Sequence, residues 1–148
     1  MRARLLTLFV AASACVGLAA SPASAQTTVL RGSLTGAQVP TGGDADGSGQ
    51  AVVVIDDSSN RICVIVFVQG ISASTGGHVH KGSAGEIGPH AVELNTPQGT
   101  TAGAGSATCT TEPPAVLRDI AANPSGYYVN VHSTEYPLGA VRSQLSAG

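Results

Sequence analysis

Three histidines have the residue type and the spacing of a metal site. His78 and His80 are separated by one residue, and His132 follows far downstream in the segment 127–133. In an extended strand, residues i and i+2 point to the same side, about 6.6 Å apart along the chain. A neighbouring strand that carries His132 would complete a face of three imidazoles, a ligand set that suits copper or zinc.

Alternation along the expected strands places other polar side chains beside these histidines. When the valines of these segments point into the core, their polar neighbours point outward. We therefore expect one outer face to hold His78, His80, Asn130, His132, Arg142 and Gln144. His90 follows Pro89 and is either a further ligand or a solvated loop residue.

Two interpretations of the histidines remain open. In the first, they bind copper or zinc, the only cofactors that the sequence suggests. In the second, His78 and His80 form a structural network with Asn130, Glu86 or backbone carbonyl groups and hold two strands together. The geometry of the rings distinguishes the two interpretations, because ligands of one metal must converge on one point.

The first 25 residues are typical of a secretory signal. Arg2 and Arg4 precede an uncharged stretch over 5–20, and the small residues Ala23-Ser24-Ala25 form a cleavage site. We predict cleavage after residue 25, which leaves one secreted domain over residues 26–148.

That domain contains two cysteines, Cys63 and Cys109. Outside the cytosol such a pair usually forms a disulfide. The chain-entropy model assigns a loop of this length about 4 kcal/mol of stabilisation. A redox role has little support, because the chain has no C-x-x-C motif.

Charge and motifs exclude several classes of function. Residues 26–148 contain nine acidic and only five basic side chains, and the basic ones are scattered, which argues against a nucleic-acid partner. We expect no membrane span after cleavage, because no second apolar stretch is long enough. The segment 44–49 matches only the first half of a calcium loop. Glu86 and Glu93 lack the aromatic residues that accompany a glycosidase pair.

Short segments rich in Val and Ile, separated by Gly, Pro, Asp and Asn, predict an all-β, antiparallel sandwich or barrel. The expected strands cover 27–34, 50–55, 61–69, 78–81, 90–94, 127–133 and 140–145. The nearly continuous apolar character of 50–55 and 61–69 predicts a hairpin that is covered on both faces. The segment 99–105 is expected to be a loop or a weak edge. The segment 113–122 predicts one short helix that covers an end of the barrel.

Four segments of the chain resemble the CHRD domain, which is named after chordin. They are LTGAQVP at 34–40, HVHKGSAG at 78–85, LRDIAANPSGYYVNVH at 117–132 and PLGAVRSQL at 137–145. The resemblance covers almost all of the predicted mature chain. The chain differs from the family at Val39, where an acidic residue is frequent, and at Ser143, where Gly is frequent.

This resemblance implies an immunoglobulin-like β-barrel that is distantly similar to copper–zinc superoxide dismutase. The order of the histidines is similar to that of the copper ligands in the dismutases, and Arg142 would attract the anion in a mechanism of that kind. Four histidines cannot fill both metal sites of such an enzyme, so only a copper-only version fits.

We predict that the protein is a secreted binding or structural module without catalysis. Its partner would be an extracellular protein or a surface component that the sequence does not identify. The alternative is a copper-binding, dismutase-like redox protein that uses His78, His80 and His132, with His90 as a further ligand.

Overall fold

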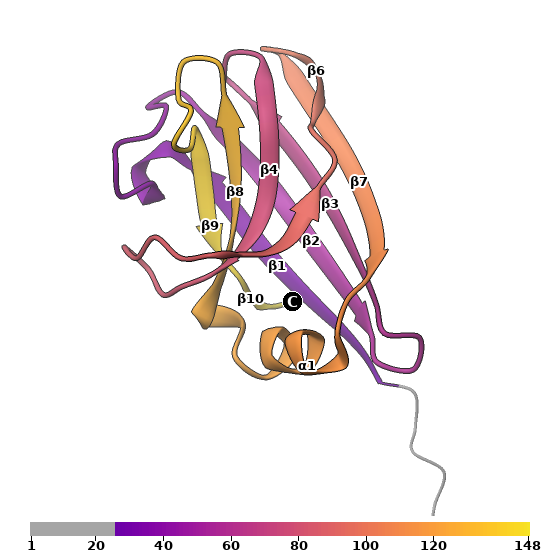
Figure 1. The fold of residues 1–148 in the computed structure, drawn as a ribbon. Helices are drawn as coiled ribbons and strands as arrows, with labels where there is room; N and C mark the ends of the chain where they lie inside the picture. Colours follow the sequence, from indigo (N-terminus) through magenta and orange to yellow (C-terminus); the bar gives the residue numbers. More distant parts are fainter. Residues whose placement is uncertain (1–25) are drawn as a thin grey trace, which may run out of the picture.

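A computed structural model describes residues 26–148 as one curled antiparallel sheet with a short helix (Figure 1). The predicted signal segment, 1–25, lies outside the described residues. The described strands are β1 (Thr27–Thr35), β2 (Ser48–Asp56), β3 (Arg61–Gln69), β4 (Ser74–Lys81), β5 (His90–Leu94), β6 (Gln98–Thr100), β7 (Gly103–Thr111), β8 (Tyr127–Ser133), β9 (Val141–Gln144) and β10 (Ser146–Ala147). The helix α1 (Pro114–Ala122) is accompanied by two 3-10 turns, η1 (Gly36–Gln38) and η2 (Pro124–Gly126). The predicted all-β class with one short helix is confirmed.

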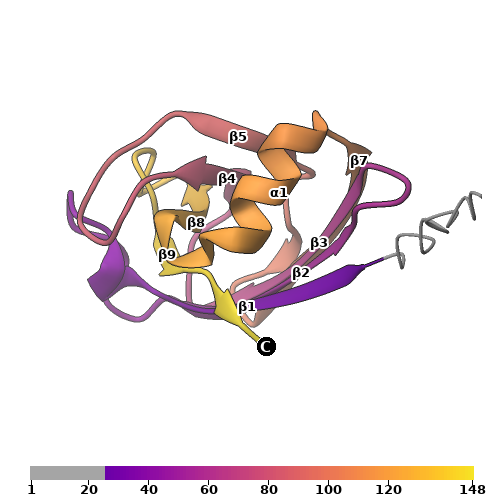
Figure 2. The same cartoon turned by 90° about the horizontal axis from the view of Figure 1, so that it is seen from below.

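The strands are hydrogen-bonded in the order β5-β4-β8-β9-β1-β2-β3-β7-β6, and β10 pairs with β1. The sheet curls into a half-barrel whose two walls face each other, with α1 lying across one end (Figure 2). Leu117 and Ile120 of α1 are fully buried against the core. The predicted role of this helix as a cover for the barrel end is therefore confirmed.

Alternating side chains of the two walls form the core. Ile62, Val64, Val66 and Val68 of β3 point inward and are at most 2% exposed. Their neighbours point away from the core, and Ile65 and Phe67 are 54% and 48% exposed. The prediction that the hairpin of β2 and β3 is covered on both faces is therefore wrong, because Val and Ile stand at outward positions without a second layer above them.

A strand that the sequence did not predict, β7, pairs with β3 along nearly its whole length. It consists of Gly, Ala, Ser, Thr and Cys, so it lacks the large apolar residues that identify a strand. Cys63 and Cys109 are directly opposite each other in this pairing and form the predicted disulfide. The bond fastens β7 to the hairpin from the outer face.

Candidate metal site

Three adjacent strands, β4, β8 and β9, position the candidate residues in two rows. His78, Asn130 and Arg142 are opposite one another in one row. His80, Tyr128 and Gln144 form the next row. Because Val79 and Val129 point into the core, both rows lie on the outer side of this wall, as the alternation predicted.

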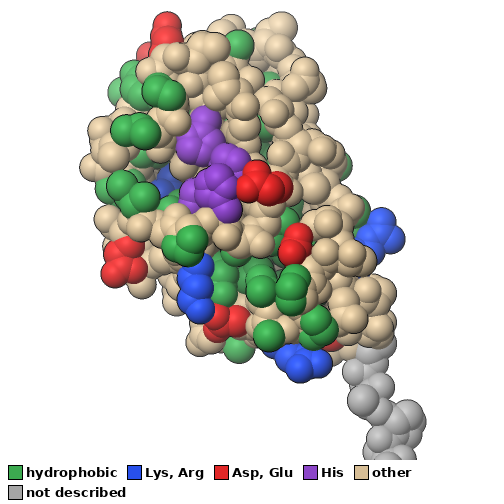
Figure 3. Space-filling model, in the orientation of Figure 1, with side chains coloured by type: hydrophobic (Ala, Val, Ile, Leu, Met, Phe, Trp, Pro, Cys, Tyr) green, Lys and Arg blue, Asp and Glu red, His purple; other side chains and the backbone are tan. Residues whose placement is uncertain are grey.

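His132 and β5 complete the cluster at its two edges. His132 is opposite Gly76, and the His78 ring lies over this glycine. On the other edge of β4, Glu93 is opposite His78. A shift of register next to Val79 then brings His90 opposite His80. Figure 3 shows the result as one patch of histidines with acidic side chains beside it.

Residues 82–89 fold back over part of the outer face and shield it from solvent. We call this segment the strap. Beneath it, Arg142, His80 and Asn130 are only 2%, 5% and 6% exposed. These side chains thus lie on the outer side of the wall and are nevertheless buried, because the strap covers them.

Side chains of the two rows hold the strap through its backbone. The Arg142 guanidinium donates to the carbonyl oxygens of Glu86, at 2.6 Å, and Ser83, at 2.8 Å. Gln144 Nε2 donates to the Gly82 carbonyl at 2.9 Å. The Tyr128 hydroxyl accepts the N–H of Gly88, where any side chain would collide with the Lys81 carbonyl oxygen.

His78, His80 and His132 converge. One ring nitrogen from each lies within 4.8 Å of the others. His78 Nδ1 lies 3.0 Å from His132 Nε2. His90 is not in this group, but its ring stacks on that of His78 with centroids 3.9 Å apart. His78, His90 and Glu93 form a second, more exposed group that meets the same distance limit.

Backbone carbonyl groups fix two of the three converging rings. His80 Nδ1 donates to the Gly88 carbonyl at 2.8 Å, and His132 Nδ1 donates to the Pro137 carbonyl at 3.0 Å. The Nε2 atom of each neutral ring therefore carries a lone pair and no proton. Within the described part of the chain, the buried His80 Nε2 has no hydrogen-bond partner. Histidines that bind metals are typically oriented by such a bond from the other ring nitrogen.

Glu93 connects His78 to His90. Its Oε2 lies 3.1 Å from His78 Nε2, and its Oε1 lies 2.7 Å from His90 Nδ1. The hydrogen bond from His90 lowers the pKa of the Glu93 carboxyl, so the group is ionised at neutral pH. From the sequence, Glu93 is considered only as half of a glycosidase pair with Glu86, and it is not expected beside the histidines. Pairing 90–94 antiparallel to 78–81 would have placed it next to the histidines.

His78, His80 and His132 are neutral at physiological pH. Burial, reinforced by the nearby His90 ring, lowers the pKa of His78 from its ordinary value of 6.5 to about 4. Burial also lowers the pKa values of His80 and His132. Neutral imidazoles are the form that binds a metal ion, so no proton has to leave these rings first.

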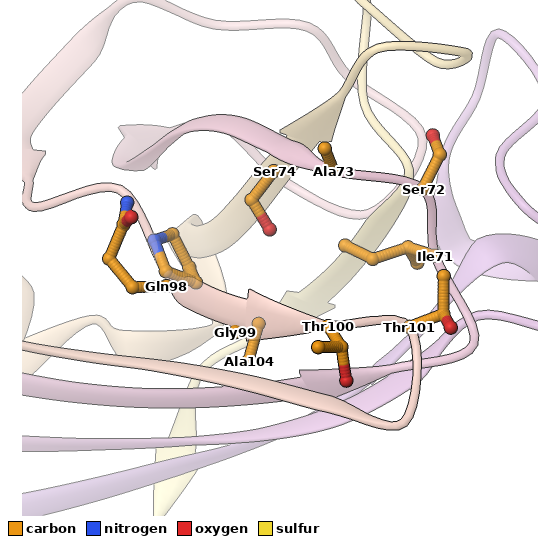
Figure 4. Close-up of a pocket in the computed structure, with 10 residues that line it drawn as sticks. Ile71, Ser72, Ala73, Ser74, Gln98, Gly99, Thr100, Thr101 and Ala104 are labelled. Carbon is orange, nitrogen blue, oxygen red and sulfur yellow. The ribbon is translucent and has the colours of Figure 1, made fainter.

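Other features offer less chemistry. A cavity of about 390 Å³ lies between the segment 71–74 and the β6–β7 turn, and the side chains of Ile71 and Ser74 point into it (Figure 4). Its lining contains hydroxyl, amide and apolar groups but no titratable side chain among the described residues. The Asp44 carboxylate accepts the N–H of Asp46 at 3.2 Å, which is a local turn bond.

Comparison with protein-family models matches the CHRD domain over residues 30–145. Comparison with curated proteins gives no significant match. The matched range contains every residue of the histidine cluster and the strap. None of the helices in residues 26–148 is long and apolar enough to cross a membrane.

Proposed function

Since the chain belongs to the CHRD domain family, we propose that it is an extracellular binding module that holds one metal ion, with copper preferred. The ligands are His78 Nδ1, His80 Nε2 and His132 Nε2. This proposal keeps the predicted role of a module without catalysis and gives the module a ligand.

The main support for the proposal is that a neutral His78 has only one ring proton for two contacts. With a pKa of about 4, His78 has one ring proton at neutral pH. Both of its nitrogens nevertheless face acceptor atoms, because Nδ1 lies 3.0 Å from His132 Nε2 and Nε2 lies 3.1 Å from the Glu93 carboxylate. A single proton satisfies only one of these contacts. If it lies between Nε2 and Glu93, two lone pairs meet at the other contact, and a metal cation placed there removes the conflict.

The distances support the same assignment. Metal–nitrogen bonds of about 2.0–2.1 Å place neighbouring ligand nitrogens about 2.9–3.4 Å apart. The separation of 3.0 Å between His78 Nδ1 and His132 Nε2 falls in this range. The third ligand atom, His80 Nε2, is buried and has no other partner among residues 26–148.

The donor set favours copper over zinc. Three neutral imidazoles suit both metals, and a nitrogen site binds copper(II) more tightly than zinc. When bound, the metal supplies a Lewis-acidic centre with an open fourth position. The chain's own residues orient the ligands and limit the access of water: Gly88 and Pro137 fix two rings, Glu93 fixes the third, and the strap covers the face.

Secretion is part of the proposal. The signal-like segment before residue 26 supports it, as does the disulfide between Cys63 and Cys109, because such bonds persist in oxidising compartments. CHRD domains are extracellular. The macromolecular partner is not identified by any of these features.

Titration of the metal-free protein with copper(II) and zinc(II), followed by calorimetry and electron paramagnetic resonance, tests the proposal. We expect one copper per chain. Loss of a residue that only hydrogen-bonds to a metal ligand lowers the affinity about 10–100-fold, and we expect His80→Ala, which removes a ligand itself, to weaken copper binding by more than that. His90→Ala is the matched control, because His90 stacks on the cluster without contributing a ligand. Equal copper affinity in the wild type and His80→Ala would refute the assignment.

A further inference from the structure

A small cavity of about 170 Å³ opens directly beside two of the proposed ligands, His80 and His132. The buried side chains of Asn130 and Arg142 also line it. Ile87 and Leu138 lie at its rim, where they are 73% and 69% exposed. The cavity thus connects the outer surface with the open side of the histidine cluster.

The Asn130 amide is a buried polar group at this cavity. This side chain is 6% exposed, yet its Oδ1 atom is buried without a hydrogen-bond partner in the described range. Gly139 packs against the amide with a φ of +135°, a conformation that a residue with a side chain rarely adopts. Burial of an unpaired amide is costly, so such a group calls for a partner. The amide can turn to present either its oxygen or its NH₂ group to the cavity.

One buried positive charge, that of Arg142, lines the cavity. The Arg142 guanidinium is 2% exposed, and no carboxylate among residues 26–148 lies within 4.0 Å of it. Its hydrogen bonds go to the carbonyl oxygens of Glu86 and Ser83 and to the amide oxygen of Gln144, so none of its acceptors neutralises the charge. The centroid of the Tyr128 ring lies 3.4 Å from Arg142 Cζ, and this neutral ring does not cancel the positive charge of the guanidinium. No acidic side chain from the described chain lines the cavity.

From these observations we propose that the cavity admits a small anion, which binds the metal at its open position and accepts a hydrogen bond from the Asn130 amide. A volume of 170 Å³ corresponds to about six waters at about 30 Å³ each, so the anion has up to about six heavy atoms. Inorganic anions and short carboxylates meet this limit. The inference rests on the proposed metal site and assigns its fourth ligand.

Azide is a suitable probe because it is a linear anion of three atoms. The copper-loaded protein is titrated with azide while the charge-transfer absorption and the electron paramagnetic resonance spectrum of copper(II) are recorded. We expect saturable binding by the wild type. Leu138→Trp, which fills the rim, and Asn130→Leu, which removes the amide, should each raise the azide Kd about 10–100-fold.

Ile65→Trp is the matched control for Leu138→Trp, because Ile65 is similarly exposed but lies on β3, outside the cavity lining. Both Trp variants should bind copper like the wild type, and Ile65→Trp should also bind azide like the wild type. If copper binds but azide leaves its spectra unchanged, the anion site is refuted and the metal site stands. If azide binds equally in all variants, the anion enters by another route and the cavity assignment is wrong. If copper itself does not bind, both proposals fail.

Discussion

Substitution of Glu93 by Gln separates a metal site from a structural histidine network. The Glu93 carboxylate accepts a hydrogen bond from His90 through Oε1, and its Oε2 lies 3.1 Å from His78 Nε2. An amide offers only one oxygen, and its NH₂ group cannot accept a ring proton. In Glu93→Gln, the proton of His78 is therefore free to move to Nδ1, where it occupies the lone pair that the metal needs.

The expected magnitude follows from the role of Glu93 as an outer partner of a ligand. Loss of such a partner typically lowers metal affinity 10–100-fold, which corresponds to about 1.4–2.7 kcal/mol. The affinity is measured by competition for copper(II) with a chelator of known strength. The fold should be preserved, because the Glu93 side chain is 71% exposed and lies outside the core.

Glu135→Gln serves as the control, because Glu135 is exposed and its side chain makes no hydrogen bond within the described residues. We expect this variant to bind copper like the wild type. An unchanged copper affinity in Glu93→Gln would refute the reasoning about the proton of His78. It would leave hydrogen bonding between strands as the role of this carboxylate.

Three further predictions concern stability, measured as the free energy of unfolding in urea. For the metal-free protein, the unfolded state binds more protons than the folded state between pH 6.5 and about 4, because the folded pKa of His78 is depressed. His78 should therefore account for a loss of about 3 kcal/mol as the pH is lowered through this window. A His78→Asn variant should lose this share and keep the part that the lowered pKa values of His80 and His132 contribute; an equally steep pH profile in the variant would exclude His78 as a source. Reduction of the disulfide between Cys63 and Cys109 should cost about 4 kcal/mol, and a loss below about 1 kcal/mol would show that β7 pairs with β3 without help from the bond. Leu117→Ala should cost about 2–5 kcal/mol because Leu117 is fully buried where α1 covers the core, whereas no loss would mean that the helix is not packed as described.

The parts of the fold that alternate large apolar residues with polar ones could be predicted from the sequence. The period of two predicts His78, His80 and Asn130 on one outer face, and the register of β4 and β8 has them on the same side of the wall. The same reasoning failed for β7, since a strand of small residues has no apolar period. It also wrongly predicted that the outward side chains of this strand, such as Ile65 and Phe67, are buried, because a run of apolar residues does not reveal whether a second layer covers the sheet.

The candidate site contains features that no pattern in the sequence predicts. The sequence of the strap, with its several glycines, is typical of a loop. The strap buries His80 and Arg142 because these side chains donate hydrogen bonds to its backbone carbonyl groups. The position of His90 depends on a shift of register in the pairing of β4 and β5. Local irregularities of this kind arise from tertiary contacts and cannot be derived from residue types alone.

X-ray absorption of the copper-loaded protein is the most direct test of the central claim, because it counts the ligands of the metal. The account predicts three imidazole nitrogens at about 2.0 Å, with one contribution lost in His132→Ala. A first shell dominated by oxygen, or a spectrum that His132→Ala leaves unchanged, would contradict the proposal that His78, His80 and His132 hold the ion.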